Sequence, residues 1–421
     1  MNYKISRLKN GTRVVAAPLK ERKSVSIGLW VEAGGRDEEA RVSGISHFLE
    51  HMVFKGTSKR TANQIKEAVE GVGGSMNAFT GEEYTCFLAK ASRRHFEEVF
   101  AVLADMVLDA SLKSEEIEKE RTVIMEEIKM TQDQPSQLAE ELLSEIVWSG
   151  HALGRPLAGT IETVGALKRE ELLKYRDTYY RPGFVTVAAS GDIDQKTLTD
   201  ITQAHFKENK PTPSKKKDPF TRTDKKSVMK FFSKATEQTH LALAARGFPK
   251  NHPDEDALDL LSVVLGGNMS SRLFNEVREE RGLAYDIGSY VRKYHETGAF
   301  IVAAGVDNKK SKEAMKVIIA ELRKIAAKEA SAGELERARE FYLGQLDLGL
   351  ENTMNHMLWV GESVVSFDRC KTQKEIVEKV KKVTAKDLTR VAAQLFGTKA
   401  LYLAMVGPDV SEADFENILS A

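Results

Sequence analysis

The chain has 421 residues and a formal net charge of zero, because 62 lysine and arginine residues balance 62 aspartate and glutamate residues. This balance argues against a nucleic-acid-binding protein and against a polybasic membrane-surface protein, since both need a positive excess to attract phosphates. The length exceeds that of one ordinary core and favours two or more domains.

The cysteines and the N-terminus bear on the compartment of the protein. Cys86 and Cys370 each stand alone, which disfavours a disulfide scaffold or a cysteine zinc site and fits a reducing environment. The opening stretch MNYKISRLKNGTRVV lacks the apolar segment of a signal peptide, and no apolar run has the length of a membrane span. We therefore expect a soluble, cytoplasmic protein with neither a membrane partner nor a nucleic-acid partner.

Strand-like and helix-like segments are distributed along the whole chain. Apolar runs typical of strands occupy 25–34, 84–92, 240–248 and 298–306. Long helical patterns, of about 15 residues or more, lie between these runs. The combination predicts an α+β fold in which helices pack on one face of a mainly antiparallel sheet.

The segment GISHFLEHMVFKG, residues 44–56, predicts an amphipathic helix with two distinct faces. Its apolar residues recur at helical spacing and form a core-facing stripe: Ile45, Phe48, Leu49, Met52 and Val53. His47, Glu50 and His51 lie on another face, in the order H-x-x-E-H. Two imidazoles one turn apart suit zinc, and Glu50 is placed to take a proton from an attacking water. The alternative is an exposed polar face that carries two histidines by chance.

A second helix, predicted from Ser114 to about residue 128, carries carboxylates in an unusual place. Ile117, Ile124 and Ile128 define its apolar stripe, and Glu120 and Glu127, seven residues apart, fall on or beside that stripe. Carboxylates on a core-facing stripe are costly unless they are paired or bind a metal. The two acids therefore suit a metal site, one as a ligand and the other in support of a ligand. The alternative is an ordinary solvent-exposed, acid-rich helix.

The sequence also repeats itself. Residues 167–193 and 383–410 share a helix, a turn and an apolar strand at a constant offset of 216, and 114–128 matches 332–346 at an offset of 218. These offsets predict two homologous tandem domains, 1–208 and 228–421. The intervening segment, 209–227, is rich in lysine, proline and threonine and is predicted to be a linker.

The second copy lacks the chemistry of the first. Its matching positions replace His47, Glu50 and His51 with Leu258, Leu261 and Ser262, and replace Glu120 and Glu127 with Ala338 and Gln345. The metal is therefore expected in domain 1–208 alone. Two histidines and one glutamate leave a coordination position free, as catalytic zinc sites do.

With HFLEH and ERTVIMEE in view, the whole chain resembles the pitrilysin/insulinase family of zinc peptidases. The resemblance is to the half-length branch that includes bacterial processing-protease-like enzymes and the mitochondrial processing peptidase beta subunit. The family places a glutamate about 76 residues after the second histidine and another glutamate seven residues before it, as Glu127 and Glu120 stand here. The resemblance implies that His47, His51 and Glu127 bind zinc, that Glu50 is the general base and that Glu120 is a supporting catalytic acid.

The resemblance also implies residues that contact the substrate. Asn77 and Ala78 match an asparagine-alanine stretch on a strand that pairs with the backbone of an extended peptide. Arg278 and Tyr285 match residues that face the scissile bond and hydrogen-bond its carbonyl or the developing oxyanion. The alternatives are a turn residue at a strand entrance for Asn77 and, for the other pair, a surface helix with a packed aromatic ring.

These expectations amount to a bacterial, cytoplasmic zinc metalloendopeptidase that hydrolyses unfolded peptides or presequence-like substrates inside a closed homodimer chamber. Two alternatives stay open. The chain could be a catalytic subunit that needs a separate, metal-free partner chain, or a non-catalytic scaffold subunit. The intact motif and both glutamates argue against a scaffold, and Arg278 and Tyr285 on the same chain favour self-sufficiency.

Overall fold

The computed structural model describes residues 3–206, 218–221, 224, 226–397, 400–408 and 412–420. Most of the predicted linker, 209–217, 222–223 and 225, lies outside these described residues. Among the described helices, none is both long enough and apolar enough to cross a membrane.

The chain forms two compact units that are discontinuous in sequence. The first comprises Met1–Ile128, Arg155–Asp218 and Asp347–Gln373, and the second comprises Lys129–Gly154, Pro219–Leu346 and Lys374–Ala421. The predicted domains, 1–208 and 228–421, are contiguous and so differ from these units. The difference arises because each half of the chain contributes one segment to the compact unit that the other half builds.

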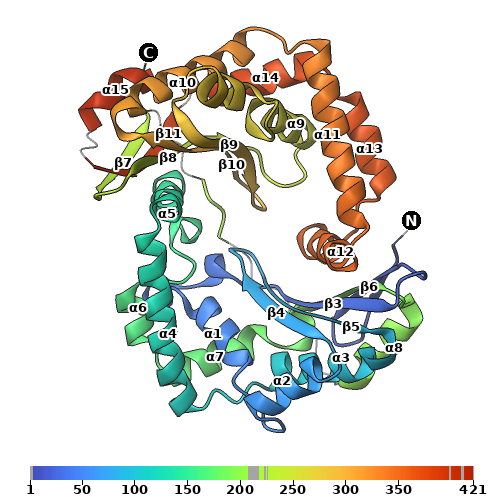
Figure 1. The fold of residues 1–421 in the computed structure, drawn as a ribbon. Coiled ribbons are helices and arrows are strands. Elements are labelled where there is room, and N and C mark those ends of the chain that lie inside the picture. The colour runs from blue at the N-terminus through green and yellow to red at the C-terminus, as the bar shows by residue number, and fades with distance from the viewer. Residues whose placement is uncertain are drawn as a thin grey trace. The chain divides into compact units, whose positions relative to one another are not determined.

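A six-stranded sheet forms the centre of the first unit (Figure 1). Its strand order is β1-β2-β6-β3-β5-β4, with one parallel pair, β2 and β6, among antiparallel neighbours. The strands are β1 (Ile5–Arg7), β2 (Arg13–Pro18), β3 (Ser24–Val31), β4 (Ser75–Thr80), β5 (Thr85–Ser92) and β6 (Val185–Gly191).

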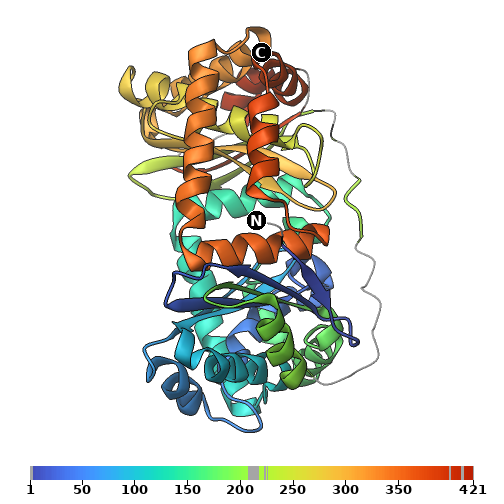
Figure 2. The same ribbon diagram turned by 90° about the vertical axis from the view of Figure 1, so that its right-hand side faces the viewer.

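Helices cover both faces of this sheet. One face carries the larger core, which includes Val14 and Ala16 of β2. The other face carries a second core, where Val15 and Ala17 of the same strand pack with α12 (Thr353–Phe367). Helix α12 lies across β2, β3 and β6 (Figure 2). The remaining helices of the unit are α1 (Ile45–Val53), α2 (Ala62–Glu70), α3 (Phe96–Asp109), α4 (Ser114–Asp133), α6 (Ile161–Ala166), α7 (Arg169–Tyr179) and α8 (Gln195–His205).

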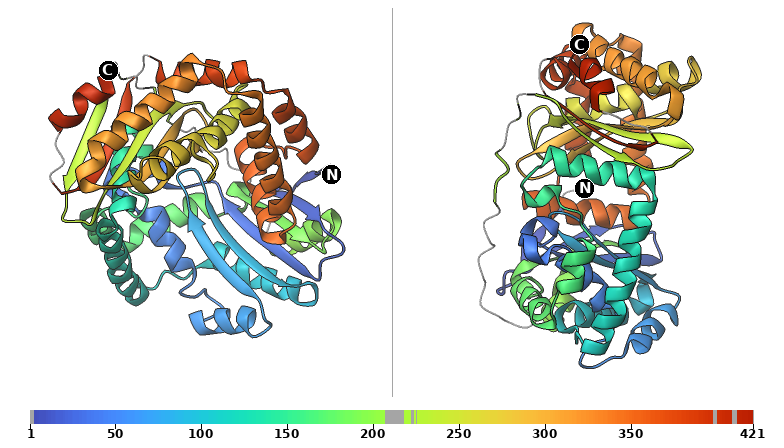
Figure 3. Two further views of the ribbon diagram at one scale, coloured as in Figure 1. Left: turned by 45° about the horizontal axis from the view of Figure 1, so that its top comes forward. Right: turned by 90° about the vertical axis from the view of Figure 1, so that its left-hand side faces the viewer.

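The second unit repeats this plan with five strands in the order β7-β11-β8-β10-β9. Helix α5 (Pro135–Val147) covers one face of its sheet against β8 and β11 (Figure 3). The strands are β7 (Val228–Ser233), β8 (Gln238–Gly247), β9 (Ala284–Lys293), β10 (Gly298–Asp307) and β11 (Leu401–Gly407). The other helices are α9 (Glu255–Gly266), α10 (Ser311–Ala327), α11 (Ala332–Leu350), α13 (Gln373–Lys382), α14 (Ala385–Phe396) and α15 (Glu412–Ser420).

The predicted α+β fold and its internal repeat are confirmed. Strands β6 and β11 begin and end at the predicted offset of 216 residues, and the order β2-β6-β3-β5-β4 recurs as β7-β11-β8-β10-β9. Both sheets are mainly antiparallel, as expected. The prediction placed helices on one face only, whereas α12 and α5 also cover the opposite faces.

Candidate metal centre

Helix α1 begins at a position that only glycine fits comfortably. Gly44 has φ +93°, and a Cβ there would lie 2.5 Å from the carbonyl oxygen of Ala158. The buried Glu38 carboxylate accepts hydrogen bonds from the backbone N–H groups of Gly44 (2.8 Å) and Ser46 (2.9 Å). Burial raises the pKa of Glu38 to about 7, although these hydrogen bonds oppose the rise. The start of the helix that carries H-x-x-E-H is thereby fixed.

The predicted apolar stripes of α1 and α4 both lie in the larger core of the first unit. All five stripe residues of α1 are buried, as are Ile117, Ile124 and Ile128 of α4. Packing of these two stripes orients the polar faces of both helices. Of the two carboxylates predicted on or beside the stripe, Glu120 is buried, whereas the Glu127 side chain is 44% exposed.

The polar faces bring His47, His51 and Glu127 together. One ligand atom of each residue lies within 4.8 Å of those of the other two. Glu127 Oε2 is 3.8 Å from His47 Nε2 and 3.5 Å from His51 Nε2. Ligands of tetrahedral zinc at about 2.1 Å from the ion lie about 3.4 Å apart, so this spacing fits zinc. Among the residues that the structure describes, no second group of three potential ligands is as close.

The electrostatics of His47 also suit a metal ligand. Burial, and secondarily the neighbouring His51, lowers the pKa of His47 to about 4. The ring is therefore neutral near pH 7 and keeps a lone pair for a cation. A set of two neutral imidazole nitrogens and one carboxylate oxygen is typical of zinc that retains an open position.

Glu120 contacts the ring nitrogen of His51 that faces away from Glu127. Its Oε2 lies 3.1 Å from His51 Nδ1, so that this ring nitrogen is placed to donate while Nε2 faces Glu127. The other oxygen, Oε1, forms an ion pair with Lys55 in the turn after α1. Glu120 therefore stands beside the candidate ligands, as predicted for a supporting acid, whereas Lys55 was not singled out from the sequence.

Glu50 lies on the same face as the two histidines and has a partner that the sequence analysis missed. The Thr80 hydroxyl at the end of β4 donates a hydrogen bond to Glu50 Oε2 at 2.5 Å. Burial raises the pKa of Glu50 above its ordinary value, and the Thr80 hydrogen bond opposes the rise. A carboxylate that is partly desolvated and held at one oxygen is well suited to accept a proton at the other.

Asn77 and Ala78 lie in β4, which forms one edge of the first sheet. Their register partners, Leu88 and Phe87, belong to β5, the single neighbour of β4. The Asn77 side chain accepts from the Ala78 N–H at 2.8 Å. An edge strand has backbone groups available for an added strand, so the predicted substrate strand has the topology that β-augmentation requires.

Arg278 and Tyr285 come together in the second unit. Arg278 lies in a short π-helix, η6 (Phe274–Glu279), and Tyr285 near the start of β9. The Arg278 guanidinium carbon is 5.6 Å from the centre of the Tyr285 ring and 4.7 Å from that of Phe274. Tyr285 is 74% exposed and the Arg278 side chain is 38% exposed, so the polar groups of both residues are accessible to a ligand.

The second unit lacks a metal set at the equivalent positions. Leu258 and Leu261 of α9 are fully buried apolar residues, and Ala338 of α11 is buried as well. These residues offer no ligand atoms. The duplicated fold thus carries the histidine-glutamate group in its first copy.

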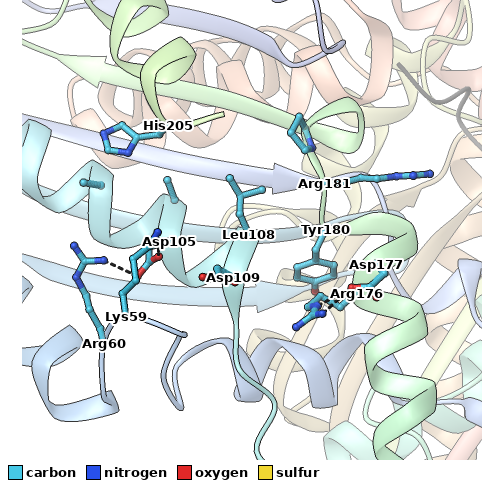
Figure 4. Close-up of a pocket in the computed structure, with 13 residues that line it drawn as sticks. Lys59, Arg60, Asp105, Leu108, Asp109, Arg176, Asp177, Tyr180, Arg181 and His205 are labelled. Carbon is cyan, nitrogen blue, oxygen red and sulfur yellow. Dashed lines mark hydrogen bonds and ion pairs between the residues drawn. The ribbon is translucent and has the colours of Figure 1, made fainter. Parts of the chain in front are cut away.

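The first unit also has a hollow of about 740 Å³ that is separate from the candidate metal centre. It is lined by residues of α3, α7, α8 and neighbouring loops, and some of its charges form ion pairs within it: Arg60 with Asp105, and Arg176 with Asp177 (Figure 4). None of the predicted site residues lines it. The candidate site is therefore the histidine-glutamate group on α1 and α4.

Comparison with known families agrees with this fold and this group. Residues 13–161 match the family model described as insulinase (peptidase family M16), and residues 166–342 match the one described as the peptidase M16 inactive domain. Together these matches span most of the chain. The protein belongs to peptidase family M16.

Individual relatives extend over nearly the full length. The chain is 36% identical over 402 residues to an uncharacterized zinc protease of Bacillus subtilis, covering 95% of this chain and 97% of that protein. It is 33% identical to an uncharacterized zinc protease of Streptomyces coelicolor, covering 95% and 88%. A crystal structure of a Helicobacter pylori protease has the same fold, with a TM-score of 0.91, 23% identity and coverage of 96% and 99%.

Proposed function

We propose that this protein is a zinc metalloendopeptidase that cleaves internal bonds of unfolded peptides or presequence-like substrates. The convergence of His47, His51 and Glu127 at ligand spacing carries the proposal. Relatives named as zinc proteases, at 36% and 33% identity over almost the whole chain, support it. These three side chains would hold the ion.

The proposed chemistry combines the ion with side chains of the first unit. Zinc at this position supplies a Lewis acid for the scissile carbonyl and makes an attacking water more acidic. Glu50 accepts the proton of that water at its free carboxylate oxygen and passes it to the leaving amine. The Thr80 hydroxyl donates a hydrogen bond to the other oxygen.

Substrate binding is proposed for residues of both units. The exposed edge of β4, with Asn77 and Ala78, would pair with an extended peptide through backbone hydrogen bonds. Arg278 and Tyr285 would donate hydrogen bonds to the substrate carbonyl or to the oxyanion that develops from it. Recognition of backbone more than side chain favours unfolded substrates over folded proteins.

We further propose that the enzyme works as a cytoplasmic homodimer. The metal-bearing face of one copy would then meet the Arg278 and Tyr285 face of the other, and together they would enclose a chamber. Enclosure excludes folded proteins from the site. A mass measurement on the purified protein tests this arrangement against a catalytic subunit that needs a different, metal-free partner.

The decisive experiment separates metal binding from proton transfer. We expect Glu50→Gln to keep about one zinc per chain and to lower kcat for a quenched fluorogenic peptide by roughly 10²–10⁴-fold, because a general base is lost. His51→Ala should lose both zinc and activity, and a chelator should abolish wild-type hydrolysis. Glu67→Gln, which changes an exposed acid on α2, is the matched control. Full turnover by the Glu50 variant, or by the metal-free protein, contradicts the proposal.

A further inference from the structure

The turn after α1 contains Lys55, which has no role in the proposed chemistry but contacts Glu120. Lys55 lies four residues after His51, and its Nζ forms an ion pair with Glu120 Oε1. The second oxygen of the same carboxylate lies 3.1 Å from His51 Nδ1. The Glu120 side chain is 7% exposed, and that of Lys55 is 30% exposed. One buried carboxylate thus links the lysine to a candidate metal ligand.

We propose that Lys55 is a positioning residue for metal binding: it holds the Glu120 carboxylate in the orientation that accepts the His51 Nδ1–H and directs His51 Nε2 toward Glu127. The inference rests on the proposed function, because it assigns a role within the same site. It adds a residue that the H-x-x-E-H spacing does not include.

The physical reason lies in the geometry of a ligating imidazole. Which ring nitrogen faces a metal is set by the hydrogen bond that the other nitrogen makes, and loss of that partner commonly costs 10–100-fold in metal affinity. A carboxylate with a single partner can rotate or move away from it. An ammonium group at one oxygen leaves the other oxygen to the histidine, and it also compensates the cost of burying the carboxylate.

The second copy of the fold provides an internal comparison. At the spacing that matches His47 with Leu258, the position of Lys55 is taken by Gly266, and Glu120 is replaced by Ala338. A Cβ at Gly266 would lie 2.4 Å from the backbone nitrogen of Ser289, so a lysine does not fit there. The half without the histidines therefore lacks both members of the ion pair. This is expected if the pair serves the metal site and not the fold that both halves share.

The test is a chelator competition that measures zinc affinity directly. We expect Lys55→Met to weaken zinc binding by about 10-fold or more, while Lys55→Arg, which keeps a cation, stays within about 3-fold of wild type. In a Glu120→Gln background, Lys55→Met should have little further effect, because the residue through which it acts has already been changed. Lys196→Met removes an exposed lysine that pairs with Asp200 and should leave zinc affinity unchanged.

Two results would overturn the proposal: wild-type zinc affinity in folded Lys55→Met, or equal weakening by that change with and without Glu120. A lower melting temperature of metal-free Lys55→Met with unaltered zinc affinity would assign the pair to stability alone and would also overturn it. If Lys55→Met does not fold, Lys55→Gln takes its place and is again compared with and without Glu120→Gln. Failure of the wild type to bind zinc or to cleave peptides contradicts the proposed function instead, so the two failures are distinguishable.

Discussion

At the scale of single residues, Thr80 connects two parts of the proposed mechanism. It ends β4, the edge strand proposed to pair with the substrate, and its hydroxyl donates to Glu50 at 2.5 Å. A threonine at a strand end usually needs no functional explanation. Here its partner is the proposed general base, so the hydroxyl limits the orientations that the Glu50 carboxylate can adopt.

Replacing Thr80 with valine removes this donor with little change in shape. We expect Thr80→Val to lower kcat by about 10-fold or more, since a hydrogen bond to a charged group contributes about 1.5–3 kcal/mol. KM and zinc content should stay near their wild-type values, because Thr80 is no metal ligand. Thr80→Ser keeps the hydroxyl and should recover most of the loss. Steady-state kinetics with zinc analysis provides the check, and an unchanged kcat in the valine variant would exclude this role.

The sequence predicted the parts of the site that depend on local spacing. His47, Glu50 and His51 follow from the turn of one helix, and Glu120 and Glu127 from an apolar stripe that they interrupt. The Thr80 contact depends instead on where β4 ends relative to α1, thirty residues away, and no local pattern contains that information. Lys55 had a usable signal, because it stands one helical turn after His51.

At the scale of secondary structure elements, close packing of α12 on the first sheet requires glycine. A Cβ at Gly361 of α12 would lie 2.1 Å from Nε1 of Trp30, a residue of β3 that is 1% exposed. Gly28 of β3 is in similar contact with Met357 of the same helix. The core between α12 and the sheet is thus tightly packed on both sides.

The glycines of two helices allow a matched prediction. We expect Gly361→Ala to lower the free energy of unfolding by about 1–3 kcal/mol through overpacking against Trp30. Gly344→Ala in α11 should raise it by about 0.5–1 kcal/mol, because a Cβ there meets nothing within 4 Å and alanine favours a helix. Denaturant titrations of both variants measure these changes. Equal effects of the two substitutions would show that the close approach of α12 does not govern the result.

The sequence analysis did not predict that α5 and α12 each cover a sheet built by the other half of the chain. The strand pattern did indicate that the first sheet is covered on both faces. Adjacent residues of β2 contribute to different cores: Val14 and Ala16 to one, Val15 and Ala17 to the other. Strands that are apolar on both faces indicate a sheet covered on both sides. The sequence does not show which distant helix provides the second cover, because α5 and α12 are ordinary amphipathic helices until their partner sheets are known.

At the scale of the whole molecule, one fold occurs twice, and within the described part of the chain the candidate ligand set occurs in its first copy alone. The second copy keeps the sheet order and replaces the ligands with apolar or uncharged residues. Arg278 and Tyr285 belong to the copy without the candidate ligands, and their proposed task is substrate binding. The proposed homodimer assigns them to the site of the partner copy.

A subunit-mixing experiment tests this assignment. Glu50→Gln and Arg278→Ala homodimers should each be nearly inactive, whereas their mixture, after subunit exchange, should recover roughly a quarter of wild-type activity. Random exchange makes half of the dimers mixed, and each mixed dimer has one intact site if the two residues act across the interface of a symmetric dimer. Size-exclusion chromatography with light scattering confirms the dimer. Absence of recovery in a mixture that has exchanged would assign both residues to sites within one chain.

The position of α12 in the sequence has a consequence for how the protein is made. Trp30 lies in an apolar face of the first sheet, whose last strand along the chain, β6, ends at Gly191. Met357, Val360 and Val364 of α12 cover this face. A nascent chain on the ribosome therefore exposes that face until α12, Thr353–Phe367, has been synthesised, long after β6 is complete, and the first unit reaches its native state only after that point. A transcript that ends before Thr353 would yield a sheet with a bare apolar surface, which is a substrate for chaperones and for aggregation.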